Sequence, residues 1–507
     1  MFFLFALSYA NATQDAWSLI RVDEPLHDQA IATSHTGSVL LSPPEDGSVW
    51  RTESVPEVDG IDLSEVWDER VAEVTGIDKW HKSGFLGQGV RIAVFDIQWF
   101  GTALRDNELG ETQTHDCWAD PLCEQAIDTL RPRFGWEMGS HGVACAEIIR
   151  ELAPEAELHL VHVNGLTTFE NAIEWAIREQ IDIISMSMTF FNESFYDGTG
   201  PISEQIDKLE EAGILMVTSA GNNAERHYED TFRDNNNNGY HEFLSGSEYL
   251  PIQAESNDGR VAALLWDEFD QCGQSDFRIE LFDVAGNLIR SSDKTQTFNN
   301  EKCVPVERIR APIEMDGGWA YLRIERRRGQ SSVPMDIMSF SGSIWGAQPQ
   351  NSMADPATHP LAFSIGAVNV DDYLHNPVEF FSSQGPGRAG LIKPNLAAPD
   401  GLSTRTYGMN RFYGTSAAAP VVASALAVRI SESPNIDPRT AAVDLQNWAM
   451  RASPYWTQPE ASMGYGRLRL PNPAQSKDRG CNSGPLRATL LLLPCFAIRR
   501  KRITKVP

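Results

Sequence analysis

The chain has 507 residues, a length that allows one large domain with additions or two to three ordinary domains. A hydrophobic fraction of 42% and 13 Trp residues indicate a packed globular protein and exclude a disordered one. The formal net charge of −27 argues against nucleic acid and anionic membranes as main partners, because contacts to phosphate need Lys and Arg. This composition fits an exported acidic protein, and an acidic protein can bind divalent cations.

The first twelve residues, MFFLFALSYANA, form an apolar run that closes on Ala10, Asn11 and Ala12. Small residues at this spacing are typical of the cleavage site of a signal peptide, although the run is short and lacks a basic start. The alternative is an apolar N-terminal strand. We expect residues 1–12 to be a signal peptide and residues 13–70 to be a separate N-terminal segment.

Between about residues 70 and 225, short apolar runs alternate with amphipathic patterns. Buried strands are predicted at 89–96, 156–163, 181–190 and 214–223. Helices are predicted at 141–152, 168–180 and 201–213. This alternation predicts an α/β fold, in which a parallel sheet has helices on both faces and functional loops gather at the carboxyl ends of its strands.

The helical period disappears from about residue 236 to 347. The segments DFRIELFD and WAYLRIER alternate apolar and polar residues, and DVAGN supplies a turn. We expect an inserted antiparallel β-sandwich at 236–347. The α/β pattern returns afterwards, so the insert interrupts one domain at 71–475.

The seven cysteines are too few for a disulfide scaffold in a chain of this size. Their placement predicts two local pairs, Cys117 with Cys123 and Cys272 with Cys303. Cys145 lies in an apolar helical run, so we expect it to be a small buried residue.

Four polar residues stand at strand ends or helix starts of the predicted sheet. Asp96 and Asn222 end strands, whereas His141 and Ser416 begin helices. Each has an ordinary structural explanation alone, because Ser and Asp cap helices and Asn is common in turns. Together they supply a nucleophile, a base, a group that orients the base, and a donor for an oxyanion.

The motifs around these residues resemble those of the subtilisin-like (subtilase) serine peptidases. The stretch GTSAAAP matches the family's nucleophile motif, and SHGVACAEII, RIAVFD and TSAGNN match its other blocks in the same order. The resemblance covers roughly residues 70–235 and 350–475. It implies that Ser416 attacks a peptide carbonyl, that His141 accepts the proton, that Asp96 stabilises the imidazolium, and that Asn222 binds the oxyanion.

The resemblance also implies a substrate-binding set. It comprises Ser187, Met188 and Thr189, in the strand that pairs with extended substrate, together with Gly221. The chain departs from the family pattern at Thr189, where a smaller residue is usual, and at Ile97 and Gln98, where Ser or Thr and then Gly follow the aspartate. The departure at Ile97 and Gln98 implies that the tight turn is rebuilt around a retained carboxylate, and the departure at Thr189 bears on specificity more than on activity.

The segment FRDNNNNGYHEF resembles the first half of a calcium loop. Asp234, Asn236 and Asn238 stand at alternate positions before Gly239, and Glu242 stands at the ninth position. The twelfth position is Ser245, so the usual bidentate glutamate is missing. The two interpretations are a weak structural calcium site and an Asn-rich hinge into the insert, and the chemistry itself needs no cofactor.

Residues 476–507 combine a Gly-Cys pair, a short apolar stretch and a basic cluster. This layout resembles the C-terminal sorting tails of certain Gram-negative bacteria; the alternative is a plain basic tail. We expect a monomeric serine endopeptidase that is secreted or held at the outer envelope, where the tail engages membrane or sorting machinery. The competing hypotheses are a non-enzymatic binding protein on a subtilase scaffold and an esterase, although an esterase of the α/β-hydrolase kind would need G-x-S-x-G.

Overall fold

The computed structural model describes most of the chain between residues 68 and 473. The described ranges are 68–102, 106–129, 139–253, 260–269, 273–294, 305–310, 318–329, 332–388, 390–450 and 459–473, with the backbone of β1 (Ala30–Thr33) and β2 (Val39–Leu41). The predicted signal peptide at 1–12, the predicted pair Cys272–Cys303 and the predicted tail at 476–507 lie outside these residues. In the helices of the described ranges, we find none that is both long and apolar enough to cross a membrane.

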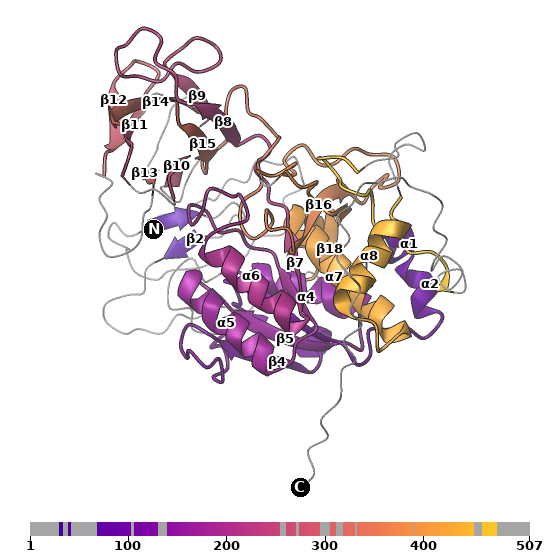
Figure 1. The fold of residues 1–507 in the computed structure, drawn as a ribbon. Coiled ribbons are helices and arrows are strands. Elements are labelled where there is room, and N and C mark those ends of the chain that lie inside the picture. Colours follow the sequence, from indigo (N-terminus) through magenta and orange to yellow (C-terminus); the bar gives the residue numbers. More distant parts are fainter. Residues whose placement is uncertain are drawn as a thin grey trace, which may run out of the picture.

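A seven-stranded parallel sheet with the order β17-β16-β7-β6-β3-β5-β4 lies at the centre of the larger part of the molecule (Figure 1). Its strands are β3 (Arg91–Asp96), β4 (Thr112–Asp116), β5 (Glu157–His162), β6 (Ile183–Met186), β7 (Leu215–Ser219), β16 (Phe363–Asn369) and β17 (Leu396–Asp400). The predicted α/β class with a parallel sheet is thereby confirmed.

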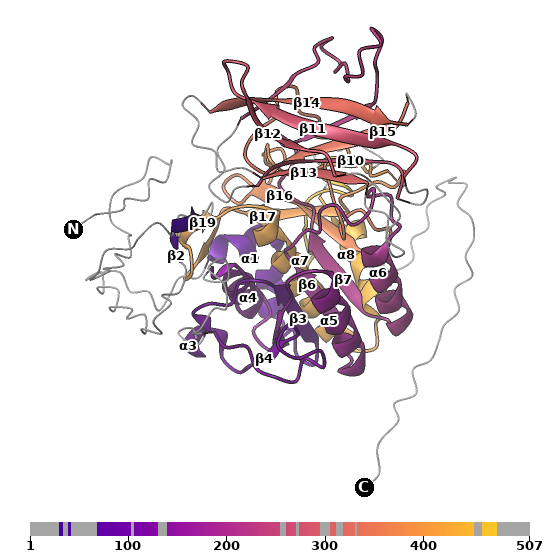
Figure 2. The ribbon, with the colours of Figure 1, turned by 90° about the vertical axis from the view of Figure 1, so that its left-hand side faces the viewer.

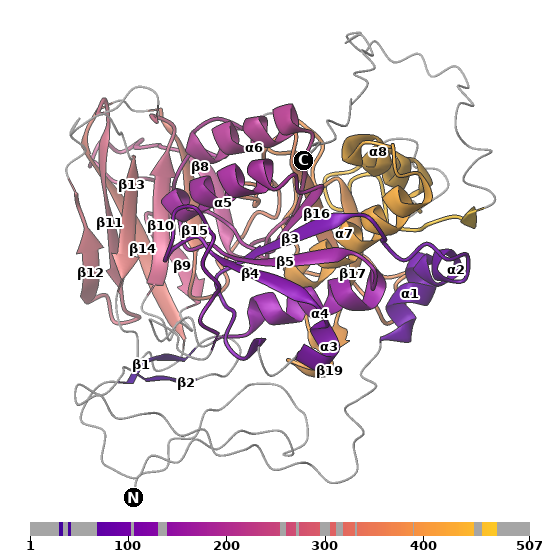
Figure 3. The same cartoon turned by 90° about the horizontal axis from the view of Figure 1, so that it is seen from below.

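Helices cover both faces of this sheet (Figures 1 and 3). One face carries α1 (Glu69–Thr75), α2 (Ile77–His81), α3 (Asp106–Leu109), α4 (His141–Leu152), α7 (Thr415–Glu432) and α8 (Pro438–Trp448), and the other carries α5 (Leu166–Arg178) and α6 (Pro201–Ala212). In β3, Ile92 and Val94 pack toward the first group, whereas Ala93 and Phe95 pack toward the second. Successive residues of a strand face opposite sides, which explains why this strand is apolar throughout.

The predicted β-sandwich lies between β7 and β16 and consists of two four-stranded antiparallel sheets (Figure 2). The inner sheet contains β8 (His227–Thr231), β10 (Arg260–Trp266), β13 (Val306–Arg310) and β15 (Pro334–Ser339). The outer sheet contains β9 (Leu250–Gln253), β11 (Asp276–Phe282), β12 (Leu288–Ser292) and β14 (Trp319–Arg328). Leu265 of β10 packs on Phe195 and Tyr196, so the inner sheet rests on the α/β part.

The sandwich begins earlier than the sequence pattern predicts. Strand β8 lies before residue 236, where the helical period is lost, and it pairs with β15 more than a hundred residues later. Only the first two residues of its five, His227 and Tyr228, are buried. Such a short polar segment shows no period of two, because its place in the sheet is set by pairing with a distant strand.

The short loop after β4 contains the predicted disulfide. Cys117 and Cys123 are bonded, which confirms that local pair. Cys145 is a buried free thiol in α4, as its apolar surroundings predict.

Candidate active site

Asp96 and His141 form a hydrogen-bonded pair at the carboxyl end of β3. Asp96 is the last residue of β3 and is fully buried, and His141 is the first residue of α4. His141 Nδ1 donates a hydrogen bond to Asp96 Oδ2 at 2.6 Å. Burial by itself lowers the pKa of His141, but the adjacent Asp96 carboxylate outweighs this and raises the pKa. Because Nδ1 carries the proton, Nε2 is left to act as a base.

The Asp96 carboxylate is held by the turn that follows it. The backbone amides of Ile97 and Gln98 donate to Asp96 Oδ1 at 2.8 and 3.0 Å. The helix comes close on the other side, since a Cβ at Gly142 would lie 2.6 Å from the Cβ of Asp96. The departure from the family pattern at Ile97 and Gln98 therefore still leaves the carboxylate held in one orientation.

Ser416 is the second residue of α7, which begins at Thr415. The N-cap position belongs to Gly414, so capping does not explain this serine. Its hydroxyl is half-buried and donates to the carbonyl oxygen of Ser187 at 3.5 Å. At the start of a long helix, unpaired amides and the helix dipole stabilise negative charge that develops on a nearby oxygen.

Pro420 frees the carbonyl of Ser416 for contacts outside the helix. A proline has no N–H, so the carbonyl four residues before it loses its usual donor. That oxygen accepts instead from Ser187 Oγ at 2.9 Å and from Cys145 Sγ at 3.6 Å. The Cys145 sulfur also lies within 4.8 Å of the ligand atoms of Asp96 and His141. These contacts place Ser416 beside the Asp96–His141 pair.

Asp96, His141 and Cys145 are also close enough to one another to hold a metal ion. The thiol is a poor ligand here, because metals bind the thiolate. Burial, followed by the charge of Asp96, raises the pKa of Cys145 well above its ordinary value. A thiol that keeps its proton therefore disfavours metal binding at this cluster.

Asn222 follows β7, and its side chain is oriented by Thr415. Asn222 Oδ1 accepts from the amide of Thr415 at 3.0 Å and from its hydroxyl at 2.9 Å. Asn222 is exposed, and because these two contacts use its Oδ1, its Nδ2 group can donate to a substrate. Nδ2 would lie 3.0 Å from a Cβ at Gly414, so a glycine at that position leaves room for the amide.

The four predicted substrate-binding residues lie at the same edge of the sheet. Ser187, Met188 and Thr189 follow β6, and Met188 packs against the core next to α5 and α6. The hydroxyl of Ser187 is used by the Ser416 carbonyl. Gly221 donates its amide to Thr415 Oγ1 at 3.1 Å, and its carbonyl accepts from the amide of Ser383 at 2.9 Å. The polar groups of Gly221 and the Ser187 hydroxyl are thus committed to contacts within the protein.

Asp400 contacts the start of α7 and is not among the site residues that the sequence motifs predict. It is the buried last residue of β17, and its Oδ2 accepts from the amide of Gly414 at 2.9 Å. Burial raises the pKa of Asp400 to about 7. A carboxylate at the end of a buried strand, as at Asp96, is the signal that could have identified it.

The raised pKa of Asp400 predicts a stability that depends on pH. The unfolded carboxyl loses its proton near pH 4 and the folded one at about pH 7, so the free energy of unfolding falls as pH rises through this window and stays low above it. We expect Asp400→Asn, whose side-chain oxygen can still accept from Gly414, to raise Tm at pH 8 and to change it little at pH 4. Thermal unfolding at both pH values measures this, and an equal change at both would contradict the assignment.

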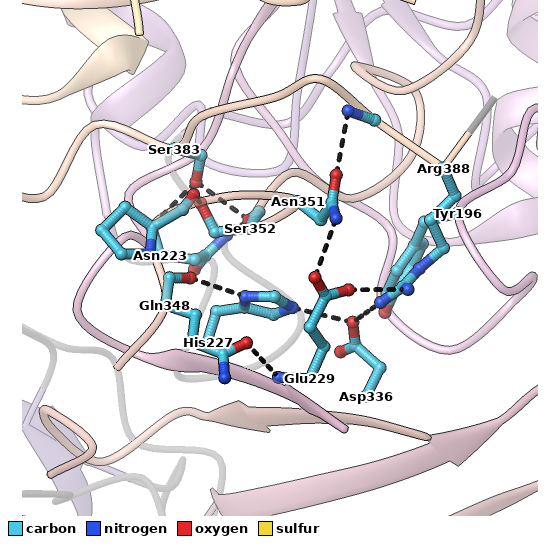
Figure 4. A network of polar contacts seen from close by, with 12 residues as sticks. Tyr196, Asn223, His227, Glu229, Asp336, Gln348, Asn351, Ser352, Ser383 and Arg388 are labelled. Atoms are coloured by element: carbon cyan, nitrogen blue, oxygen red, sulfur yellow. Dashed lines mark hydrogen bonds and ion pairs between the residues drawn. The ribbon is translucent and has the colours of Figure 1, made fainter. Parts of the chain in front are cut away.

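A polar network connects the loop of Asn222 to the insert (Figure 4). Asn223 donates its amide to Ser383 Oγ at 3.0 Å and its side-chain amide to the Ser352 carbonyl at 3.4 Å. Next to Ser352, Asn351 donates to Glu229 of β8 at 2.9 Å. This series of contacts runs from the residue after Asn222 to the first strand of the sandwich.

Arg388 forms the charged centre of the same network (Figure 4). Its guanidinium pairs with Glu229 at 2.9 Å and with the fully buried Asp336 of β15. His227 also donates to Asp336 at 2.9 Å, from Nε2. Burial alone would raise the pKa of Asp336, but His227 and Arg388 lower it, so the carboxylate stays ionised. These ion pairs attach the insert to the α/β part.

The predicted calcium loop gathers oxygen atoms, and Glu248 joins them. The Nδ2 groups of Asn236 and Asn238 donate to Glu248 Oε1 at 3.1 and 2.6 Å, and the amide of Asn238 donates to Asp234 at 2.9 Å. Glu242 accepts from the Asn236 amide at 3.3 Å. Glu248 therefore supplies a carboxylate near the loop, although the twelfth position of the calcium-loop pattern is Ser245. Arg326 forms an ion pair with Asp234 at 3.3 Å and competes with a cation there.

Calcium binding at this loop stays a prediction. If the loop binds calcium, 10 mM Ca²⁺ should raise the Tm of the wild type by about 2–5 °C, because a ligand that binds only the folded state stabilises it. Asp234→Ala should abolish this gain, whereas Asp283→Ala, in another turn of the insert, should keep it. An undiminished calcium effect in Asp234→Ala would remove the site.

The chain is similar to a known protein family in sequence and to solved structures in fold. The sequence profile of the subtilase family matches residues 135–300 and 329–470. The CspB protease of Clostridium perfringens is structurally similar over 80% of this chain and 98% of its own, with a TM-score of 0.56 and 15% identity. MycP1 without its N-terminal propeptide is similar over 82% of this chain and 98% of its own, with a TM-score of 0.43 and 14% identity. No curated protein sequence matches. The profile covers more than half of the chain, which therefore belongs to the subtilase family of serine peptidases.

Proposed function

We propose that this serine peptidase is a secreted endopeptidase whose triad is Asp96, His141 and Ser416. The observation that carries the proposal is the 2.6 Å hydrogen bond from His141 to the buried Asp96, next to the helix that presents Ser416. A hydroxyl attacks a carbonyl efficiently only when an oriented base takes its proton. The family supplies polypeptides as the substrate class, and the chemistry needs no cofactor.

Each residue of the proposed triad has a separate role in the reaction. Ser416 Oγ bonds to the carbonyl carbon of the substrate, and its proton passes to His141 Nε2. The imidazolium that forms is stabilised by the adjacent Asp96 carboxylate. His141 then returns the proton to the leaving amine, the peptide C–N bond breaks, and water hydrolyses the acyl-enzyme by the same steps.

Asn222 is proposed to stabilise the oxyanion together with the backbone amide of Ser416. Asn222→Ala should lower kcat by about 10²–10³-fold and change KM little, because the donor acts mainly on the transition state. The measurement is steady-state hydrolysis of a chromogenic peptide. A kcat within a few-fold of wild type would contradict this role.

Endopeptidase activity is tested with a denatured protein substrate and mass spectrometry of its fragments. Wild type should produce internal cuts, and Ser416→Ala should produce none under the same conditions. Fragments that shorten only from one end would contradict the proposed endopeptidase. Hydrolysis of simple esters without cleavage of any peptide in a library would favour an esterase, and inactivity toward all of these would favour a binding protein.

Export is proposed from two features. The apolar run closing on Ala-Asn-Ala is typical of a cleaved signal, and the Cys117–Cys123 bond belongs to the kind that persists in oxidising compartments. We further propose a monomer whose tail at 476–507 directs it to the outer envelope of a Gram-negative cell. N-terminal sequencing of the exported protein should begin after Ala12, and an intact Met1 on mature protein would contradict the signal peptide.

A further inference from the structure

A cavity of about 240 Å³ lies at the edge of the insert, away from the residues of the candidate active site. It is lined by Arg290, Ser291, Lys294, Arg308 and Arg310. Arg290 and Ser291 belong to β12, and Arg308 and Arg310 belong to β13. Each of these strands is the edge of its sheet, and the two strands contact one another. The cavity is therefore formed where an edge strand of one sheet lies against an edge strand of the other.

The arginines of this cavity differ in their ion pairing from other arginines of the insert. Arg278, Arg323 and Arg327 each form ion pairs with Glu280 or Glu325. Among the residues that the structure describes, no carboxylate forms an ion pair with the three arginines of the cavity, Arg290, Arg308 and Arg310. Like charges gathered in one cavity repel each other, and an anion relieves this repulsion. In a chain with a net charge of −27, such a cluster opposes the overall charge.

The nearby acidic side chains of the described residues do not pair with these three arginines. Glu307 precedes Arg308, but it is fully buried, accepts a hydrogen bond from Ser292, and has a pKa raised to about 7 by burial, which the charge of Lys294 partly offsets. Glu280, opposite Ser291 in the outer sheet, is engaged by Arg323 at 2.7 Å. Asp293 is exposed beside Lys294 and is the one remaining carboxylate in the described part of β12 and the residues that follow it. Within the described part of the chain, Arg290, Arg308 and Arg310 thus carry positive charge that no carboxylate pairs with.

We propose that this cavity binds an extended acidic segment of a polypeptide. Guanidinium groups bind carboxylates through paired N–H donors, which gives both strength and orientation. The strands add a second recognition element, because among the strands that the structure describes β12 and β13 each pair with one neighbour, and an unpaired edge can accept a further strand. Backbone pairing with such an edge requires a polypeptide, and this favours an acidic peptide over an anionic glycan.

The proposal does not depend on the triad, so it is tested with the full-length Ser416→Ala variant, which leaves the probe uncut. The probe is a fluorescent peptide of eight glutamates, and binding is followed by anisotropy at low salt. Arg290→Ala and Arg308→Ala should each weaken binding about five- to tenfold, in keeping with the loss of a charge-assisted contact on a partly exposed surface. Arg327→Ala removes the same charge outside the cavity and should change the affinity less than twofold.

Three further probes separate the alternatives. An octalysine peptide should not bind, and an octaglutamate with alternate N-methylated amides should bind more weakly, because it cannot pair along a strand edge. Equal affinity for the methylated and unmethylated peptides would overturn the extended binding mode. Unchanged affinity in an Arg290→Ala, Arg308→Ala double variant of wild-type Tm would overturn the site. A sulfated oligosaccharide of equal charge that binds more tightly than the peptide would overturn the ligand class.

Discussion

Asp96→Asn should lower kcat/KM by about 10⁴-fold while leaving the protein folded. An asparagine fits the space of the carboxylate, but its amide cannot stabilise a positive ring. Its side chain can also donate to Nδ1, which would move the imidazole proton to Nε2, the atom that receives the proton of Ser416 in the proposed mechanism. The substitution should therefore slow the chemical step and leave Tm near that of wild type.

The pH profile separates this explanation from a general loss of structure. The Asp96 carboxylate raises the pKa of His141, and the ring acts as a base only when it is neutral. Wild-type kcat/KM should therefore rise as pH increases through this raised pKa. The small residual activity of Asp96→Asn should rise at lower pH, because the pKa falls when the charge is removed. Asp120→Asn, in an exposed loop, is the matched control, and a similar loss in that variant would contradict the assignment.

Arg388→Ala should destabilise the protein by about 3–5 kcal/mol, because it leaves the buried Asp336 carboxylate without one of its cationic partners. Asp336 is fully buried, and His227 would remain beside it as a hydrogen-bond donor. The lost ion pairs also join the insert to the α/β part, so unfolding should start at that junction. Chemical denaturation measures the free energy, and hydrogen exchange of β8 and β15 locates the loss.

A double variant distinguishes a buried unpaired charge from a loss of packing. Arg388→Met with Asp336→Asn removes both charges and keeps an acceptor for His227. Since replacing a whole buried ion pair costs far less than removing one partner, this variant should recover most of the stability. A single Arg388→Ala variant within about 1 kcal/mol of wild type would show that the network contributes little.

The parts of the fold with strong local signals could be predicted from the sequence. Helix α4 spans His141–Leu152 as its amphipathic pattern predicts, because Pro154 follows it closely and its apolar residues face one core. Strand β3 ends at Asp96 as expected, since a continuous apolar run buried on both faces has few alternatives. The order of the motifs then led to the residues that the structure brings together around Ser416.

Other features depend on contacts between distant segments. Glu248 and Arg388 carry no local signal, because each acts on residues that come close only when the chain is folded. Arg388 reaches Asp336 across 52 residues and Glu229 across 159. The helix start near Ser416 is similar: local preference favours a serine cap, but the chain uses Gly414 at φ +113, a conformation that suits glycine.

The most direct test of the proposed triad is covalent labelling of Ser416. A fluorophosphonate probe reacts with a serine only when a neighbouring base activates it, and digestion with mass spectrometry locates the labelled residue. Wild type should be labelled on Ser416 at a rate that rises with pH through the pKa of His141, and Ser416→Ala should not be labelled. Absence of labelling in mature folded wild type, or labelling at another serine, would contradict the assignment of Asp96, His141 and Ser416.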